Sequence, residues 1–309
     1  MRPAKSAQTL RADLLLLLVA AIWGFGFVAQ RAGMDHVGPY TFNGLRFLLG
    51  GCCLIPLALR STRQPQLQQR AQMSALKAGC LAGLFLFAGA TLQQVGLQYT
   101  TAGKAGFITG LYVIFVPIIG LLFGQRTNGG TWAGGLLAVA GLYLLSIQGT
   151  LSISFGDLLE TIGALFWACH VLVLGYLSPR TSAIRLAMIQ FFVCGGLSLL
   201  VAIGLENISG AGILQAALPI FYGGVISVGA GYTLQVVVQR KAHPAHAAIL
   251  LSLESPFAAL GGWLLLHELL SGRALIGCLL MLAGMVLSQL WPLLQPRQIA
   301  AAAADSQLH

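Results

Sequence analysis

The chain has 309 residues, of which 57% are hydrophobic and only 8% are charged. Because a soluble domain carries about 25% charged residues, this composition excludes a sizeable soluble domain and indicates an integral membrane protein. The net charge of +9 could suggest a nucleic-acid partner, but membrane topology explains the placement of the basic residues, so we expect no nucleic acid.

Apolar runs of about 20 residues fill almost the whole chain, and each is long enough to cross the roughly 30 Å hydrocarbon core as a helix. Pro39, Pro179 and Pro244 fall at boundaries between runs, as helix punctuation should. The sequence therefore predicts an all-α integral membrane protein with ten transmembrane helices. The predicted spans are 13–30, 39–59, 76–97, 102–123, 131–148, 156–177, 185–205, 214–238, 245–267 and 273–293.

The same pattern occurs twice along the chain. The matches are Ala20, Trp23, Phe47 and Gly51 with Ala164, Trp167, Phe191 and Gly195 (144 residues later), Thr91-Leu92-Gln93 with Thr233-Leu234-Gln235 (142 later), and Gly134 and Gly141 with Gly277 and Gly284 (143 later). Each half has five predicted helices, an odd number, so the halves would form inverted repeats around a central cavity. Residues 1–21 also resemble a signal peptide, but the match of Trp23 to Trp167 favours a retained first helix.

Basic residues predict the orientation of these spans. If the N-terminus is cytoplasmic, 13 of the 17 Lys and Arg residues lie in cytoplasmic segments, which is a strong positive-inside signal. We therefore expect both termini in the cytoplasm of a cell with a bacterial-type inner (plasma) membrane. The predicted organisation is a cytoplasmic tail at 1–12, a first five-helix repeat at 13–149, a second at 153–293, and a cytoplasmic tail at 294–309.

Several short motifs occur in order along the chain. They are Ala-Ile-Trp-Gly at 21–24, Leu-Arg-Phe at 45–47, the segment from Thr100 to Pro117, Leu-Glu-Ser-Pro at 253–256, His-Glu at 267–268 and a glycine-rich last helix. Their order, with the duplication, resembles the EamA branch of the drug/metabolite transporter (DMT) superfamily. The resemblance implies ten helices, two repeats, a central cavity and transport of small metabolites, often outward. Gln125 and Ser255 depart from the family pattern.

Two ionisable residues stand deep in predicted helices, where a charge is costly and calls for a partner, a wet cavity or a function. Glu254 is roughly 13 Å from the inner end of its span and could bind a substrate ammonium group or act as a proton-coupling site. Arg46 is roughly 10 Å from the outer surface and could hold a substrate carboxylate. Structural roles remain open for both: a carboxyl satisfied beside the Pro256 kink, and a guanidinium that snorkels outward.

Three further ionisable residues are candidates for gating or proton traffic. Lys104 and Glu160 have similar predicted depth near the outer side, which permits an ion pair that could act as a gate, although two separately solvated charges would fit equally well. His170 lies deep in its span and suits proton traffic, whereas a neutral histidine hydrogen-bonded inside the bundle is the simpler interpretation.

Aromatic and amide side chains are candidates to line the cavity, with core packing as the alternative for any one of them. Gly134/Gly141 and Gly277/Gly284 have heptad spacing, which predicts close packing of the last helix of each half. The candidate lining residues are Trp23, Gln93, Tyr112, Trp167, Gln190, Tyr232 and Gln235.

Motifs of other classes are missing from the sequence. There is no Walker-type phosphate loop, no HExxH and no Cys/His cluster, so we expect no cofactor, no metal and no catalysis. The sequence predicts a secondary transporter that moves small organic metabolites by alternating access and exports amino acids or related zwitterions. Protons are a candidate coupling ion, and monomer and homodimer stay open. The alternatives are a multidrug effluxer of lipophilic cations with the same fold, and a membrane-embedded enzyme acting on lipid-linked substrates.

Overall fold

A computed structural model describes residues 3–62, 74–125, 127–146, 154–267 and 271–294 of the chain. Every regular element in these ranges is helical. The helices are α1 (Pro3–Gly33), α2 (Pro39–Thr62), α4 (Ala75–Gly96), η1 (Leu97–Tyr99), α5 (Ala102–Thr109), α6 (Tyr112–Leu122), α7 (Gly129–Ser146), α8 (Phe155–Leu177), η2 (Ser178–Arg180), α9 (Ala183–Leu205), α10 (Gly210–Gln215), α11 (Ala217–Phe221), η3 (Tyr222–Tyr232), α12 (Thr233–Gln239), α13 (Pro244–Leu251), α14 (Glu254–Leu266) and α15 (Gly272–Leu294).

Eight helical stretches in the described ranges are long and apolar enough to cross a membrane. The protein is therefore a multi-pass membrane protein. Two more helices pair with each other beside them: α7, and α15 with its shorter apolar segment Leu275–Ser288. The eight stretches are Leu10–Gly33, Pro39–Arg60, Ala75–Tyr99, Ala102–Leu122, Phe155–Arg180, Ala183–Leu205, Ala217–Gln239 and Pro244–Leu266.

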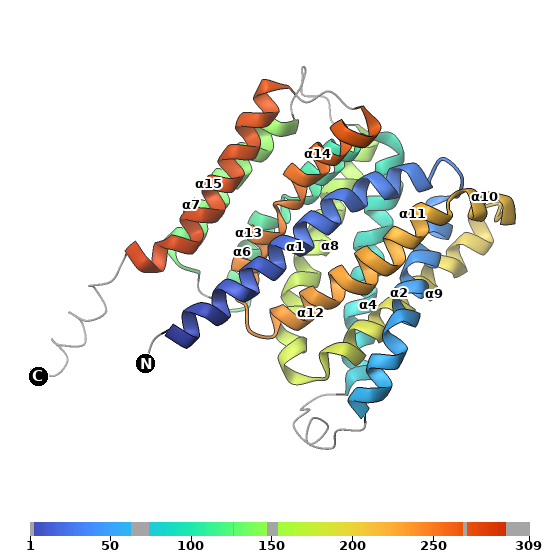
Figure 1. The fold of residues 1–309 in the computed structure, drawn as a ribbon, viewed down its shortest axis with the longest axis horizontal. Coiled ribbons are helices and arrows are strands. Elements are labelled where there is room, and N and C mark those ends of the chain that lie inside the picture. The colour runs from blue at the N-terminus through green and yellow to red at the C-terminus, as the bar shows by residue number, and fades with distance from the viewer. Residues whose placement is uncertain (1–2, 63–73, 126, 147–153, 268–270, 295–309) are drawn as a thin grey trace, which may run out of the picture.

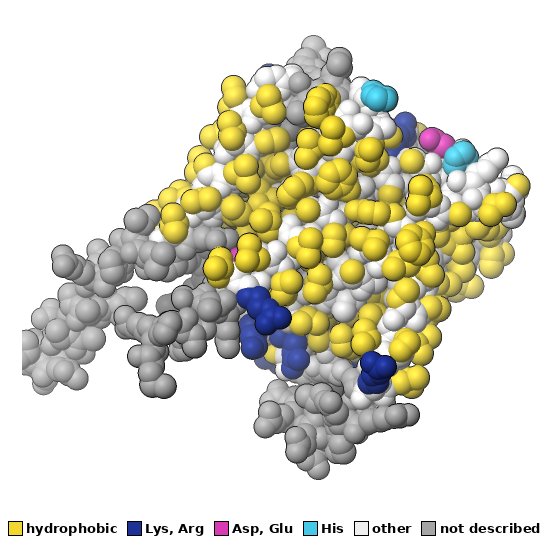
Figure 2. Space-filling view, viewed as in Figure 1, with side chains coloured by type: hydrophobic (Ala, Val, Ile, Leu, Met, Phe, Trp, Pro, Cys, Tyr) yellow, Lys and Arg dark blue, Asp and Glu magenta, His cyan; other side chains and the backbone are white. Residues whose placement is uncertain are grey.

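The long helices lie side by side as one bundle, with α7 and α15 at one edge (Figure 1). Helix α1 starts and α15 ends at the same end of this bundle. The visible face is covered mostly by apolar side chains, and the largest groups of Lys and Arg gather at its lower end (Figure 2). This distribution suits a bundle whose sides contact lipid and whose ends contact water.

Two of the predicted continuous helices are broken near their middle. The predicted span 102–123 is divided into α5 and α6 at Gly110 and Leu111, and the span 245–267 into α13 and α14 at Ser252 and Leu253. At the second break, Pro256 has no N–H for the carbonyl of Ser252 four residues earlier. The N–H of Ser255 donates to that carbonyl instead, at 3.1 Å, so the chain tightens locally before α14 begins.

The predicted span 214–238 is also divided into shorter helices. The segment starts as the short helices α10 and α11, continues as the π-helical η3 and ends as α12. Glycines allow η3 to approach its neighbours closely: a Cβ on Gly231 would stand 2.8 Å from Nε1 of Trp23 on α1, and one on Gly224 would stand 2.6 Å from Leu49 on α2. Wider π turns of this kind are frequent at functional sites.

Candidate functional site

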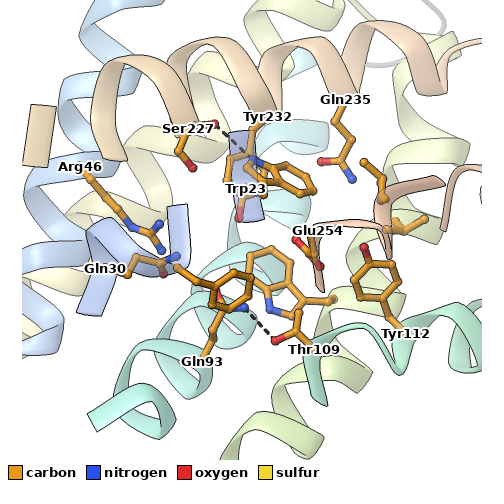
Figure 3. A pocket seen from close by; sticks show the side chains of 14 residues that line it. Trp23, Gln30, Arg46, Gln93, Thr109, Tyr112, Ser227, Tyr232, Gln235 and Glu254 are labelled. Atoms are coloured by element: carbon orange, nitrogen blue, oxygen red, sulfur yellow. Dashed lines mark hydrogen bonds between the residues drawn. The ribbon is translucent and has the colours of Figure 1, made fainter. Parts of the chain in front are cut away.

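A pocket lies in the middle of the bundle, where segments from both halves of the chain meet (Figure 3). Its walls come from α1, α2, α4, α5, α6, α8, η3, α12, α13 and α14. The residues that line it are Trp23, Phe27, Gln30, Arg46, Gln93, Thr109, Tyr112, Trp167, Val171, Ser227, Tyr232, Gln235, Leu251 and Glu254.

Arg46 brings a fixed positive charge to this pocket. Its side chain is 1% exposed, its Nε donates to Oδ1 of Asn43 at 2.9 Å, and its guanidinium carbon lies 4.7 Å from the centre of the Phe47 ring. Asn43 is held in turn, because its amide donates to the carbonyl of Ala90 at 2.9 Å. Nη2 of Arg46 has no hydrogen-bond partner among the described residues, so this donor is free to bind an anionic group.

Glu254 brings a carboxyl group to the same pocket. It is the first residue of α14 after the helix break, its side chain is 3% exposed, and the Tyr112 ring stands beside it (Figure 3). Arg46 and Glu254 reach the pocket from different sides, and no ion pair between them is found within the described ranges. Oε1 of Glu254 has no hydrogen-bond partner among the described residues, which leaves it available to a cationic group.

Packed aromatic rings form a wall of this pocket. The ring centres of Trp23 and Tyr232 are 4.4 Å apart, and those of Trp167 and Tyr232 are 5.9 Å apart. The indole of Trp23 also donates to the carbonyl of Ser227 at 3.4 Å. An amphipathic wall of this kind can contact the apolar part of a small organic molecule.

The lining residues fall largely into pairs with the spacing of the sequence repeat. Each pair contributes one side chain from each half of the chain. The pairs are Trp23 with Trp167 and Phe27 with Val171 (144 residues apart), and Gln93 with Gln235, Thr109 with Leu251, and Tyr112 with Glu254 (142 apart). The last two pairs flank the two helix breaks, which are themselves 142 residues apart.

Hydrogen bonds lead from the pocket to a second buried acid. The amide of Gln93 donates to Oγ1 of Thr109 at 3.0 Å, and that hydroxyl donates to Oε2 of Glu160 at 3.2 Å. Glu160 is fully buried and is not among the lining residues.

Lys104 pairs with Asp157 rather than with Glu160, the partner that similar depth had permitted. Nζ of Lys104 lies 2.7 Å from Oδ2 of Asp157. Asp157 stands one turn nearer the helix end, where the hydroxyl of Ser154 accepts from its N–H at 3.2 Å and its own carboxylate accepts from the N–H of Ser154 at 2.9 Å. This capping box holds the carboxylate within reach of the half-exposed lysine.

Eight of the ten residues that the sequence suggests for the cavity line the pocket, and His170 and Gln190 do not. Nε2 of His170 lies 3.0 Å from Oε1 of Gln190, and the His170 ring packs edge-on against Trp167 at 5.9 Å. Six lining residues were missed: Phe27, Gln30, Thr109, Val171, Ser227 and Leu251. Spacing would have found some of them, because Trp23, Phe27 and Gln30 share one face of α1.

The described part of the chain holds no cluster of His, Cys, Asp or Glu side chains that could bind a metal ion. Cys194 is buried, the other five cysteines are partly or fully exposed, and all six are free thiols. The convergent groups of the site are therefore one guanidinium, one carboxyl, amides, hydroxyls and aromatic rings.

The sequence is similar to transporters of one family. The model of the EamA-like transporter family matches residues 10–147 and again residues 154–290. An uncharacterized transporter of Archaeoglobus fulgidus is 32% identical over 93% of this chain and 88% of its own length. The uncharacterized transporter YoaV of Bacillus subtilis is 24% identical over 88% and 94%. The uncharacterized inner membrane transporter YedA of Escherichia coli is 30% identical over about half of each chain.

The fold is also similar to that of a protein of known crystal structure. The two chains superpose with a TM-score of 0.68 at 20% identity, over 93% of this chain and 99% of the other.

Proposed function

Because the chain belongs to the EamA-like transporter family, we propose that it exports a small organic zwitterion, an amino acid or a close relative, across an inner (plasma) membrane by alternating access. The observation that carries this proposal is the pocket itself. It combines one free guanidinium donor and one free carboxyl oxygen, at a site built from both halves of the chain.

The two helix breaks support alternating access. In secondary transporters, substrate sites tend to lie at the repeat interface, where discontinuous helices occupy corresponding positions of the two halves. Here the breaks at Gly110 and Ser252 are 142 residues apart, and the residues next to them line the pocket. This pattern supports ten membrane spans in two inverted five-helix repeats, with α7 and α15 as the fifth span of each. The basic residues support cytoplasmic termini.

The charges of the pocket favour a zwitterion as substrate. Arg46 suits a carboxylate, because a guanidinium presents planar paired donors to it, and Glu254 suits an ammonium group. The rings of Trp23 and Tyr232 would contact the part of the substrate between or beside these groups. Lipophilic drugs, the substrates of the alternative effluxer, would leave the charge of Arg46 buried without a partner, which is unfavourable. An enzyme on lipid-linked substrates would need a convergent catalytic set, and the pocket has one acid only.

The test uses purified protein in liposomes and a panel of labelled amino acids, with and without an imposed pH gradient. Wild type should accumulate one class of amino acid. The variants Glu254→Gln and Arg46→Gln should each lose binding by about tenfold or more, since a hydrogen bond to a charged group contributes about 1.5–3 kcal/mol. The exposed Asp35 supplies the control: Asp35→Asn should bind as wild type does. Folded protein that binds no amino acid, and binds lipophilic cations instead, would overturn the substrate class.

A further inference from the structure

Glu160 is a buried acid that the substrate site does not use. It lies on α8, its side chain is fully buried, and only one of its oxygens has a hydrogen-bond partner among the described residues: Oε2 accepts from Thr109, while Oε1 has none. Thr109 itself lines the pocket and accepts from Gln93, which also lines it. Two consecutive hydrogen bonds, from Gln93 to Thr109 and from Thr109 to Glu160, therefore connect Glu160 to the pocket lining.

No positive charge compensates this carboxyl group in the described structure. Lys104 is paired with Asp157 at 2.7 Å, and Arg31 donates to the carbonyls of Leu97 and Gln98 at 3.1 and 3.4 Å. The two nearby acids, Asp157 and Glu254, can only repel a negative charge on Glu160. Because an unpaired buried carboxylate is costly, Glu160 should hold a proton in this arrangement.

The remaining ionisable groups on α8 and on the elements packed against it are either uncharged or distant. Tyr99, Tyr112 and Cys169 are neutral side chains, and His170 faces Gln190. Those that lie toward the opposite end of the bundle are Lys77 at the start of α4, Arg180 in η2, and His243 and His246 at the start of α13.

The internal repeat shows that this feature belongs to one half only. The ion pair has a counterpart, because His246 and Asp13 are the repeat partners of Lys104 and Asp157, and Nε2 of His246 lies 2.9 Å from Oδ1 of Asp13. Glu160 and the hydroxyl of Thr109 have no such counterpart in the other half. Leu16 stands at the position of Glu160, and Leu251 at that of Thr109. Among the described residues, a buried acid hydrogen-bonded to a pocket hydroxyl thus occurs in the half-site of Lys104 and Asp157 and not at the repeat-related position.

We propose that Glu160 is the proton-binding site of this transporter, loaded from the Lys104–Asp157 end, while Arg46 and Glu254 bind the substrate. This inference rests on the transport function proposed above. In one cycle, a hydronium ion outside gives its proton to the Glu160 carboxylate and becomes water. The proton later leaves to water on the cytoplasmic side, so no bond of the substrate changes. Thr109 is the last residue of α5 before the helix break, so the charge on Glu160 acts directly on the segment that positions Tyr112.

The first arm of the test needs no substrate. Because Glu254 is a second buried carboxyl, infrared difference spectra are recorded on Glu254→Gln in liposomes, between acidic and alkaline buffer, and should contain a buried protonated-carboxyl band. Adding Glu160→Gln to this variant should remove the band, and adding Thr109→Val should shift it. The control is Thr161→Val, which removes a hydroxyl that donates only to the carbonyl of Asp157 on the same helix at 2.7 Å; it should leave the band unchanged. A band that persists in Glu160→Gln would overturn the inference, whatever the substrate is.

The second arm separates coupling from binding. With the amino acid that wild type transports, Glu160→Gln should keep exchange at equal pH within about twofold of wild type, but flux driven by a pH gradient should fall to the level without a gradient. Glu254→Gln should lose both. Full gradient-driven flux in Glu160→Gln would contradict the assignment of Glu160 as the proton-binding site, but not the assignment of Arg46 and Glu254 to the substrate. Absence of any amino-acid flux in wild type would sink the proposed function, while the infrared result would still decide where the proton binds.

Discussion

Tyr112 and Glu254 occupy the same place in the two halves of the chain: each begins the helix that resumes after a break, and they are 142 residues apart. Both line the pocket, and the Tyr112 hydroxyl and Oε1 of Glu254 have no hydrogen-bond partner among the described residues. A buried polar atom without a partner costs about 1–3 kcal/mol. The pocket thus holds polar groups that a bound molecule can satisfy.

Tyr112→Phe should separate binding from stability. Because the hydroxyl faces the Glu254 carboxyl without a hydrogen bond of ordinary geometry in the free protein, its removal should leave the free energy of unfolding nearly unchanged. Affinity for the transported amino acid should fall by about two- to tenfold, because one hydrogen bond contributes about 0.5–1.5 kcal/mol to the binding free energy. Thermal unfolding in detergent and isothermal titration calorimetry measure the two effects.

Tyr222→Phe is the matched control for that variant. The Tyr222 hydroxyl donates to the carbonyl of Ile22 at 2.9 Å and does not line the pocket. Its removal should lower the free energy of unfolding by about 1 kcal/mol and leave the affinity unchanged. If Tyr112→Phe destabilised the protein as much as Tyr222→Phe does, the Tyr112 hydroxyl would have to have a partner in the free protein.

Arg46→Lys should lose amino-acid binding although it keeps the positive charge. Lysine has no Nε to donate to Asn43 and no planar group to lie over Phe47, so the ammonium would not be held toward the pocket. We expect amino-acid affinity to fall by about tenfold or more. Arg31→Lys tests a lysine replacement outside the pocket, where Arg31 contacts backbone carbonyls. Equal losses in both variants would mean that carboxylate binding is not specific to Arg46.

Part of this site could be predicted from sequence because charged and aromatic residues are rare and conspicuous in apolar helices. Arg46, Glu254 and the two repeat-related tryptophans stand out for that reason. Pro256 predicts a kink in the second broken helix, but the break at Gly110 could not be predicted, since Gly110 looks like any small residue in a helix and the break depends on local hydrogen bonds. The partner of Lys104 could not be predicted either, because Asp157 and Glu160 lie one turn apart. Only the capping box determines which carboxylate lies within reach of the lysine.

Two repeat-related contacts, the Lys104–Asp157 ion pair and the His246–Asp13 contact, should control access to the pocket from opposite ends. Each pair joins one half of the chain to the other, Lys104 to Asp157 and Asp13 to His246. Because these pairs are partly exposed, each contributes only about 0–1 kcal/mol to stability, so Asp157→Asn and Asp13→Asn should both fold. We expect Asp157→Asn to open the outer end more often and Asp13→Asn to open the cytoplasmic end.

A single cysteine at Ser227, in a background without the six native cysteines, reports which end opens. Ser227 lines the pocket. An impermeant maleimide added outside should label it faster in Asp157→Asn, and the same reagent inside inverted vesicles should label it faster in Asp13→Asn. Faster labelling from one and the same side in both variants would contradict opposite gates.

Two adjacent glycines of α7 should differ sharply in what they tolerate. A Cβ on Gly134 would stand 2.5 Å from the carbonyl oxygen of Gly284 on α15, whereas a Cβ on Gly135 meets nothing within 4 Å. Gly134→Val must therefore push α7 and α15 apart, and overpacking of this kind typically costs about 1–3 kcal/mol. Gly135→Ala should leave thermal unfolding in detergent unchanged. Equal melting temperatures for the two variants would mean that the close approach of α7 and α15 contributes nothing to stability.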